Sequence, residues 1–412
     1  MLEPPSPTSM RTLSLAVFFL ALAGCSGRTP CCAPTPVPVE NRARALAYDA
    51  LIVDTHIDVP YRLRETPEDV SVRTERGDFD HPRALEGGLD VAFMSIYIPA
   101  EYQETGGARA LADSLIDGVE AMAEAAPDKF AVVRSVGDVA RRREPGVVLL
   151  ALGIENGAPV EGDLDALRHF RDRGVRYVTL THSRDNEISD SSYDGTGTHG
   201  GLSDFGRDVV RAMNRLGIMI DVSHISDAAF EDVMEVTTVP VIASHSSARA
   251  FTPGFERNMS DDMIRRLAEN GGVIQINFGS SFLLQRVQTD RAAIRARFAD
   301  ELQSRGLEAG TPAYDAFEAE FNARNPLRLA DMTDVADHID HVVGLVGIDH
   351  VGLGSDYDGV GPTLPVGLED VSTFPNLVAE LIRRGYSDAD IRKVLGENTM
   401  RVWRAVEDAA TE

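Results

Sequence analysis

Eight apolar runs rich in β-branched residues alternate with amphipathic segments along this chain, and this alternation limits the fold more than any other feature. Runs of this length and composition are typical of buried strands. A strand followed by a helix, repeated eight times, predicts a parallel (β/α)₈ TIM barrel, with its active site at the carboxyl ends of the strands. The runs occupy residues 51–57, 90–97, 146–154, 175–181, 217–223, 239–245, 271–277 and 350–356.

The segments between these runs have the apolar spacing of helices. Residues 203–215 begin at Ser203, a favoured N-cap residue, and Gly217 follows as a stop signal. Residues 279–330 interrupt the alternation with two charged helical pieces. We interpret them as an insertion after the seventh strand, and the sequence leaves open whether it serves as a lid or a dimer surface. Residues 369–408 predict two or three closing helices. Further helical segments are 108–126, 161–173, 226–236, 260–269 and 331–346.

The amino-acid composition limits which partners the protein can bind and which side chains could bridge two metal ions. Hydrophobic residues make up 43% of the 412 residues, enough for a large folded core. The formal net charge of −25 argues against nucleic-acid binding, because phosphate backbones need a basic surface. The only two lysines, Lys129 and Lys393, do not end a predicted strand. A carboxylated lysine therefore cannot bridge two metals here, so if any group bridges them it must be a carboxylate such as Glu155.

The N-terminal segment has the features of an export signal. Residues 13–23 form an apolar run of signal-peptide length, too short to span a bilayer, and Leu22-Ala23-Gly24-Cys25 ends it in the manner of a bacterial lipobox. We predict a lipoprotein signal peptide over 1–24, lipidation at Cys25, and a Pro/Ser-rich tether over 25–40. Residues 41–412 would then be a catalytic body held at the membrane on the periplasmic face of a bacterial envelope. An ordinary signal peptide with a chance cysteine is the alternative.

Metal-binding residue types stand at the ends of four of the predicted strands. His56 and Asp58 end the first strand, Glu155 the third, and His224 and His245 two consecutive later ones. A glutamate has two carboxylate oxygens and can bridge two cations about 3.5 Å apart. We predict that His56, Asp58 and Glu155 hold one divalent ion. Glu155, His224 and His245 would hold the second, and a hydroxide bridging the two ions would be the nucleophile.

Three further residues near strand ends are candidates for catalysis and substrate binding. Asp356 follows the eighth strand and is placed to move a proton from water to a leaving amine. Asp358 competes for that role, and we assign it to the following turn. His182 follows the fourth strand and could polarise a substrate carbonyl, although a structural role is nearly as good an interpretation. Arg257 lies in a loop after the sixth strand, where it could pair with a substrate carboxylate or remain solvated.

These residues lie in segments that resemble the membrane (renal) dipeptidases, zinc enzymes of the amidohydrolase superfamily. The resemblance covers nearly the whole body, in order. It implies a (β/α)₈ barrel, two Zn²⁺ per chain and hydrolysis of free dipeptides, including some with a C-terminal D-residue. The matching segments are DTHID (54–58), GIENG (153–157), YVTLTHSRDN (177–186), GLSDFGRDVVRAMNRLGIMIDVSHIS (201–226), PVIASHSSARAF (240–251), RNMSDD (257–262), GLGSDYDGV (352–360) and GLEDVSTFPNLVAELIRRGYS (367–387).

The family's residue roles carry over position by position. The resemblance implies that His182 contacts the scissile carbonyl, that Arg257 holds the C-terminal carboxylate of the substrate, and that Asp356 handles the proton. Two departures bear on specificity rather than on chemistry. Asn156 stands where many members have a glycine, and the 279–330 insertion is longer than in the mammalian enzymes. The implied metal ligands are His56, Asp58, Glu155, His224 and His245.

Two other functions remain open at this point. One is a different amidohydrolase reaction on the same metals, such as lactone, β-lactam or phosphoester hydrolysis. Arg257 discriminates here, since a neutral ester has no carboxylate for it to bind. The other is a non-catalytic lipoprotein that binds metal or peptide, which has no need of Asp356. The sequence therefore predicts a lipid-anchored binuclear zinc dipeptidase, with the oligomeric state left open.

Overall fold

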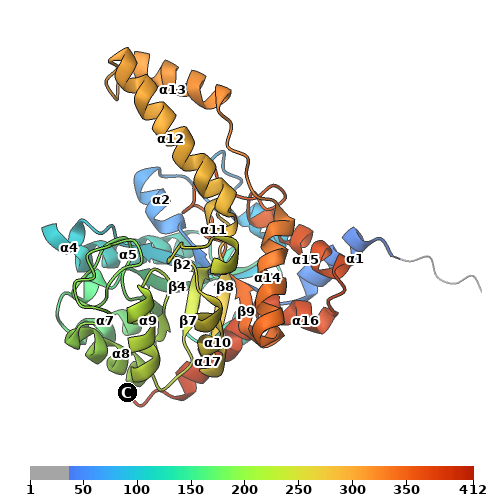
Figure 1. The fold of residues 1–412 in the computed structure, drawn as a ribbon. Helices are drawn as coiled ribbons and strands as arrows, with labels where there is room; N and C mark the ends of the chain where they lie inside the picture. Colours follow the sequence, from blue (N-terminus) through green and yellow to red (C-terminus); the bar gives the residue numbers. More distant parts are fainter. Residues whose placement is uncertain (1–36) are drawn as a thin grey trace, which may run out of the picture. The chain divides into compact units, whose positions relative to one another are not determined.

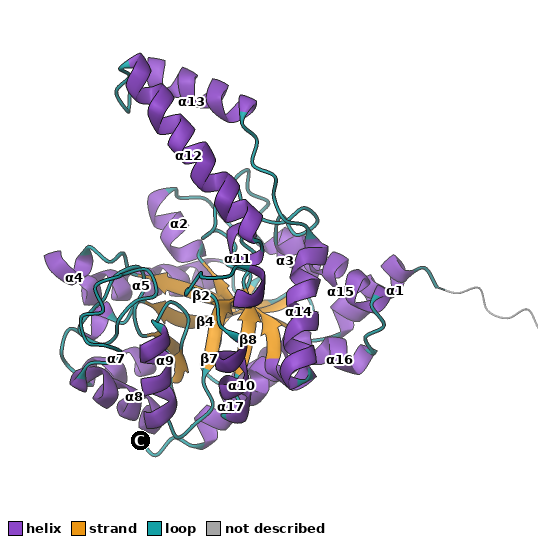
Figure 2. Cartoon of the chain, in the orientation of Figure 1, coloured by secondary structure: helices purple, strands orange, loops and turns teal. Residues whose placement is uncertain are grey.

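Parallel strands that close into a barrel form the centre of the protein (Figures 1 and 2). The structure is a computed structural model that describes residues 37–412. Eight strands pair around the ring in the order β1-β2-β4-β5-β6-β7-β8-β9, and β9 pairs back with β1. The predicted (β/α)₈ barrel is thereby confirmed. Its strands are β1 (Ile52–Ile57), β2 (Leu89–Tyr97), β4 (Val148–Glu155), β5 (Val175–Thr179), β6 (Met219–Asp221), β7 (Ile242–Ser246), β8 (Val273–Ile276) and β9 (Val351–Leu353).

One further strand, β3 (Phe130–Val132), was not predicted from the sequence. It pairs in parallel with residues 148–150 at the start of β4, whereas β5 pairs with residues 152–155 at its end. A strand of three residues is shorter than the apolar runs by which strands are recognised. β3 therefore extends the sheet beside the ring without taking part in its closure.

Helices follow the barrel strands and cover the outside of the ring (Figure 1). The segments with helical periodicity all form helices close to their predicted bounds. In α8, Ser203 accepts a hydrogen bond from the Gly206 N–H as the N-cap, and Gly217 ends the helix with a φ of 69°. These helices are α2 (Val59–Glu65), α3 (His81–Gly87), α4 (Tyr102–Thr105), α5 (Ala108–Ala125), α6 (Val136–Arg142), α7 (Asp165–Arg173), α8 (Asp204–Leu216), α9 (Asp227–Val236), α10 (Asp261–Glu269) and α14 (Met332–Val346), with 3₁₀ turns at Ala158–Val160, Arg249–Phe251, Ile348–His350 and Val371–Thr373.

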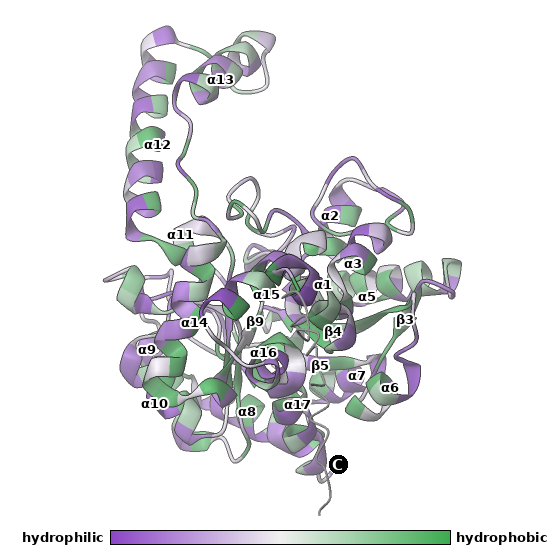
Figure 3. Cartoon of the chain, turned by 90° about the vertical axis from the view of Figure 1, so that its right-hand side faces the viewer, coloured by the Kyte–Doolittle hydropathy of each residue, from purple (hydrophilic) through white to green (hydrophobic). Residues whose placement is uncertain are grey.

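The predicted insertion is present after the seventh barrel strand, β8. It consists of α11 (Ser280–Leu283), α12 (Gln285–Arg305) and α13 (Pro312–Arg324). Helices α12 and α13 form a largely polar hairpin that projects from the barrel (Figures 1 and 3). Aromatic side chains hold its two arms together, since the Phe298 ring lies 5.1 Å from the Phe321 ring. The C-terminal part supplies three closing helices, α15 (Phe374–Arg383), α16 (Asp388–Arg392) and α17 (Asn398–Asp408).

A helix precedes the barrel. α1 (Val39–Asp49) begins within the last two residues of the predicted tether and buries Leu46 and two alanines. The predicted signal peptide (1–24), the lipidation site Cys25 and the remainder of the 25–40 tether lie outside the described residues. Between residues 37 and 412, no helix has both the length and the apolar character needed to cross a bilayer.

The barrel interior is an apolar core that supports the carboxyl ends of the strands. Phe93 of β2 packs 5.2 Å from Trp403 of α17 and 5.5 Å from Tyr177 of β5, measured between ring centroids. Helix α17 covers the end of the barrel opposite α12 (Figures 1 and 3). Gly153 of β4 allows the Tyr177 ring to lie against the strand, because a Cβ at this position would overlap the ring. The core thus extends from Trp403 to Tyr177, next to the polar residues at the carboxyl ends of the strands.

Candidate active site

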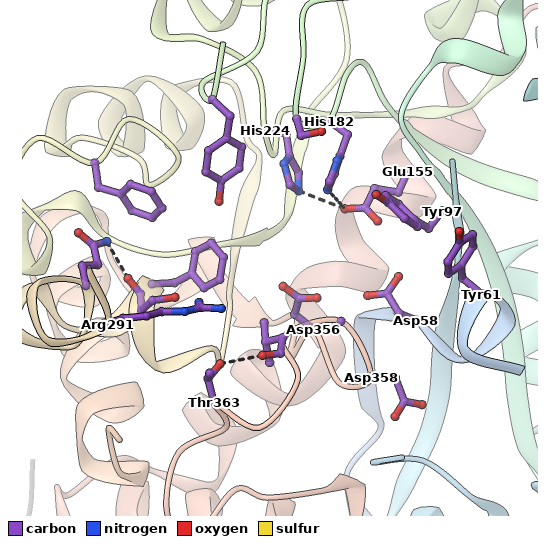
Figure 4. A pocket seen from close by; sticks show the side chains of 18 of the residues that line it. Asp58, Tyr61, Tyr97, Glu155, His182, His224, Arg291, Asp356, Asp358 and Thr363 are labelled. Atoms are coloured by element: carbon purple, nitrogen blue, oxygen red, sulfur yellow. Dashed lines mark hydrogen bonds and ion pairs between the residues drawn. The ribbon is translucent and has the colours of Figure 1, made fainter. Parts of the chain in front are cut away.

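The five predicted metal ligands converge at the carboxyl ends of the strands. His56, Glu155 and His245 lie in β1, β4 and β7, while Asp58 and His224 follow β1 and β6. Each is at most 8% exposed, so bulk water does not screen the charges in the cluster. Asp58, Glu155 and His224 line a cavity of about 940 Å³, whose floor they form (Figure 4).

Glu155 stands at the centre of this cluster, with its two oxygens facing different partners. Its Oε2 lies 3.4 Å from His56 Nε2, and Asp58 Oδ2 lies 3.5 Å from the same nitrogen. Its Oε1 lies 3.1 Å from His224 Nε2 and 3.3 Å from His245 Nε2. A carboxylate with ligand nitrogens on both oxygens has the arrangement of a group that bridges two cations.

The tautomer of His56 is determined by a hydrogen-bond chain behind it. The Tyr177 hydroxyl donates to the Thr55 carbonyl at 3.0 Å and lies 2.9 Å from His56 Nδ1. Because the hydroxyl has only one proton, it must accept from the Nδ1–H of His56. In the neutral imidazole the lone pair is then on Nε2, which points at Glu155 and Asp58.

An equivalent chain orients His245. The Ser244 hydroxyl donates to Asp221 Oδ2 at 2.6 Å and lies 2.8 Å from His245 Nδ1, so it accepts the Nδ1–H. Asp221 is fixed in turn by the Thr179 hydroxyl and by the backbone N–H groups of residues 223 and 244. The Nε2 lone pair of His245 therefore also points into the cluster. Hydrogen bonds of this kind orient the imidazole ligands of metal sites.

The protonation states suit divalent cations. Burial lowers the pKa of His224 and of His245 well below the usual range, with further lowering from Arg257 and from His56 respectively. Both imidazoles are therefore neutral, as ligation requires. Burial acts to raise the pKa of Glu155, but the surrounding imidazoles, His56 first, lower it well below its usual value.

His56 differs from the other two imidazoles. Although burial acts to lower it, the neighbouring Tyr177 and the Glu155 carboxylate raise the pKa of His56 well above its usual range. The two carboxylates around His56 Nε2 thus stabilise a positive charge between them. His56 Nε2 is also buried without a hydrogen-bond partner. A metal ion would supply that charge in place of a proton, so the donor set fits a cation.

The predicted proton carrier Asp356 lies at the edge of this cluster, close to His56 and Asp58. The amide of Asn277 donates to its Oδ2 at 2.7 Å. Burial, and then the neighbouring Asp58, raise the pKa of Asp356 well above its usual range. Gly359 makes this approach of carboxylates possible, because a Cβ there would overlap both Asp58 and Asp356.

Several site residues have strained backbones. His224 and Asp356 have φ angles of 70° and 64°, in the left-handed region that non-glycine residues rarely adopt. Such strain collects at functional sites, where the surrounding structure enforces it. Asn156, next to Glu155, has a φ of 81°, and asparagine tolerates this region better than most residues. Asn156, in place of the glycine of many family members, therefore preserves the turn that follows Glu155.

The remaining predicted residues have different surroundings. His182 lines the cavity, with its Nε2 3.6 Å from Glu155 Oε1. Arg257 is 3% exposed and lies behind the cavity wall, where its Nη2 is 3.0 Å from His224 Nε2 and donates to the His245 carbonyl at 2.8 Å. Asp358 accepts from Arg62 Nε at 2.8 Å and from a loop N–H, so its side chain holds the loop beside the site.

Comparisons with known proteins agree with this geometry. The family model for membrane dipeptidase (peptidase family M19) matches residues 40–412. The chain belongs to this family. An uncharacterised dipeptidase of Schizosaccharomyces pombe is 32% identical over 90% of this chain and 84% of its own length. A dipeptidase of Claviceps purpurea is 33% identical over 81% of this chain and 70% of its own length.

Solved structures of two similar proteins superpose on most of this chain. The probable dipeptidase PvdM from Pseudomonas aeruginosa has a TM-score of 0.78 and 30% identity, covering 91% of this chain and all of PvdM. A metallo peptidase from Rhodobacter sphaeroides, liganded with a phosphinate mimic of the dipeptide L-Ala-D-Ala, has a TM-score of 0.70 and 26% identity. The match covers 87% of this chain and 99% of the Rhodobacter sphaeroides chain. This membrane dipeptidase family member is therefore a metallo-dipeptidase, a hydrolase that acts on peptide bonds.

Several residues that support the metal cluster or line the cavity were not identified from the sequence. Asn277 follows the seventh barrel strand, so the rule that selected the metal ligands could have found it. Asp221 is a carboxylate inside an apolar run, which is also a detectable signal. Tyr177 resembles ordinary core, and Tyr193 and Arg291 reach the cavity from segments whose position depends on tertiary packing.

Proposed function

We propose that this dipeptidase is a binuclear zinc enzyme that hydrolyses the peptide bond of free dipeptides, including dipeptides with a C-terminal D-residue. The observation that carries the proposal is that the two carboxylate oxygens of Glu155 face different imidazoles. Oε2 faces His56, whereas Oε1 faces His224 and His245. His56, Asp58 and Glu155 would hold one ion, and Glu155, His224 and His245 the other. Two divalent ions would polarise the scissile carbonyl and lower the pKa of a water molecule between them.

Asp356 would take the proton of that water and deliver it to the leaving amine. Its carboxylate lies beside His56 and Asp58, and the Asn277 amide holds one of its oxygens at 2.7 Å. The other oxygen would carry the proton between the reacting atoms. A positioned acid–base group of this kind contributes roughly 10²- to 10⁴-fold to a rate.

His182 and Arg257 would orient the substrate. His182 lines the cavity next to Glu155, within reach of a carbonyl held at the cluster. Arg257 can only donate hydrogen bonds, and its Nη2 lies 3.0 Å from His224 Nε2. If His224 held a metal ion through Nε2, that nitrogen could not also accept a hydrogen bond from Arg257. An Arg257 N–H would then be free for the substrate's C-terminal carboxylate.

Substrate length and stereochemistry test the proposal. The metal-loaded enzyme should cleave free L,L and L,D dipeptides and lose activity on chelation, whereas N-acetylated dipeptides and tripeptides should resist. The L-Ala-D-Ala mimic held by the Rhodobacter sphaeroides enzyme supports including L,D substrates. Arg257→Ala should raise KM for dipeptides with little change in kcat. Equal cleavage of blocked and free dipeptides, or cleavage of lactones or phosphoesters alone, would contradict the proposal.

We also propose that the enzyme is lipid-anchored through Cys25 in a bacterial cell envelope, with its catalytic body on the periplasmic face. The order of apolar run, small residues and cysteine supports this. In a bacterial host, the full chain should incorporate labelled fatty acid and sediment with membranes, and Cys25→Ser should abolish both. Unchanged labelling would exclude this site. Sedimentation of the enzyme, with and without the α12–α13 hairpin, would separately test a homodimer.

A further inference from the structure

Within residues 37–412, the insertion places two arginines without acidic partners at the cavity that holds the predicted metal ligands. Arg291 and Arg295 of α12 both line this cavity. They are four residues apart, so they project from the same face of the helix. Figure 4 shows Arg291 extending into the cavity on the side where Asp356 lies.

Other arginines near the cavity or in the hairpin already have partners. Arg62, which also lines the cavity, pairs with Glu68 at 2.7 Å and with Asp358 at 2.8 Å. Arg324 of the hairpin pairs with Glu301 at 3.0 Å. Among residues 37–412, by contrast, Arg291 and Arg295 have no ion pair within 4 Å. Their mutual repulsion, after burial, lowers the pKa of Arg291.

The two arginines place positive charge at the cavity of a chain whose net charge is −25. The carboxylates that line the cavity have other partners: Asp58 and Glu155 the proposed metals, Asp356 the Asn277 amide, and Asp358 the Arg62 guanidinium. Two guanidinium groups held apart from them over a concave site attract an anion, and their planar donors suit a carboxylate in particular.

The position of Arg291 assigns this anion to one end of the substrate. The Arg257 guanidinium lies 5.4 Å from the centre of the Phe282 ring, and Phe282 of α11 lines the cavity together with Arg291 of the adjoining helix α12. Arg257 and Arg291 therefore both adjoin the part of the cavity wall that the insertion forms. If Arg257 holds the C-terminal carboxylate, then Arg291 is nearest to the side chain of that same residue.

We propose that Arg291 and Arg295 select dipeptides whose C-terminal residue has an acidic side chain, aspartate or glutamate. This inference rests on the proposed dipeptidase function and adds a substrate class to it. Helix α12, one arm of the projecting hairpin, would thereby form the part of the cavity wall that determines substrate specificity. The peptide-bond chemistry needs neither arginine.

Matched acidic and neutral substrates test this. For the metal-loaded enzyme, kcat/KM for alanyl-glutamate should exceed that for alanyl-glutamine about tenfold. This factor is at the lower end of the range for a hydrogen bond to a charged group, because Arg295 is exposed to solvent. Both should be assayed with the C-terminal stereochemistry that is cleaved faster. The preference should disappear in Arg291→Gln/Arg295→Gln, with alanyl-glutamine cleaved as before, and weaken in high salt. The lysine double variant should keep part of it.

Arg297→Gln is the control, because Arg297 lies on the same helix but donates to Asn325 instead of lining the cavity. It should leave the preference unchanged. Equal cleavage of the two dipeptides by the native enzyme, or a preference that survives the double glutamine variant, would overturn the inference and leave the dipeptidase proposal standing. A preference for glutamyl-alanine over glutaminyl-alanine would refute the assignment to the C-terminal residue. Failure to cleave any dipeptide would refute both proposals.

Discussion

Tyr177→Phe should weaken metal binding while leaving the barrel folded. The substitution keeps the ring that packs against Phe93 and Gly153 and removes only the hydroxyl. That hydroxyl accepts from His56 Nδ1 at 2.9 Å and donates to the Thr55 carbonyl at 3.0 Å, and all of these atoms are buried. Without it the imidazole loses its fixed tautomer and a buried N–H loses its acceptor.

The size of the effect can be worked out in two ways. A buried donor left without a partner costs about 1–3 kcal/mol. Loss of an outer hydrogen bond to a metal-binding imidazole typically lowers affinity about 10- to 100-fold. That range corresponds to about 1.4–2.8 kcal/mol, so the two values agree. The ion held by His56 should be lost first, since His245 is oriented by Ser244 instead.

Chelator competition with mass-spectrometric metal analysis measures this directly. In the Tyr177→Phe variant, metal content should fall toward one ion per chain at a chelator concentration that leaves two in the native enzyme. Tyr386→Phe is the control, because it removes a hydroxyl bonded to Asp340 at 2.6 Å on the surface. If the two variants retained metal equally well, the role assigned to the Tyr177 hydroxyl would be refuted.

Three further predictions follow from individual side chains. Asp356→Asn should lower kcat roughly 10²- to 10⁴-fold with metal content unchanged, and loss of metal would mark Asp356 as a ligand instead. Gly359→Ala should lower kcat/KM roughly 100-fold at unchanged melting temperature, because its Cβ would displace Asp58 and Asp356; full activity would show that the loop can move. Burial lowers the pKa of His338 to about 4, so its contribution to stability is complete above pH 6.5 and is lost as pH falls toward 4. The native enzyme should therefore lose about 2 kcal/mol more than His338→Gln between pH 7.5 and pH 5 in denaturant unfolding, and equal losses would contradict that pKa.

The barrel could be predicted because its strands are continuous apolar runs. Burial on both faces makes each parallel strand hydrophobic throughout, so His56, Glu155 and His245 stand out as polar residues at the ends of such runs. Strand β3 was missed for the opposite reason, since its three residues form too short a run. The periodic signal thus identifies elements that cross the core and overlooks short ones beside it.

The supporting residues were harder to predict because they look like core. Tyr177 and Phe93 have the same apolar surroundings, and only the distance of 2.9 Å to His56 Nδ1 distinguishes the tyrosine. Arg291 lies on a charged helix, where arginine is ordinary. Its importance comes from the fold of the insertion, which sets α12 at the cavity. Relations across long sequence separations of this kind leave no local pattern.

Metal reconstitution tests the central claim most directly. The enzyme stripped of metal should be titrated with Zn²⁺ while bound zinc and the rate of dipeptide hydrolysis are measured together. A bridging Glu155 between two ligand sets predicts two bound ions per chain and activity that is maximal only at the second equivalent. Full activity at one equivalent, or hydrolysis by the metal-free chain, would contradict the binuclear site.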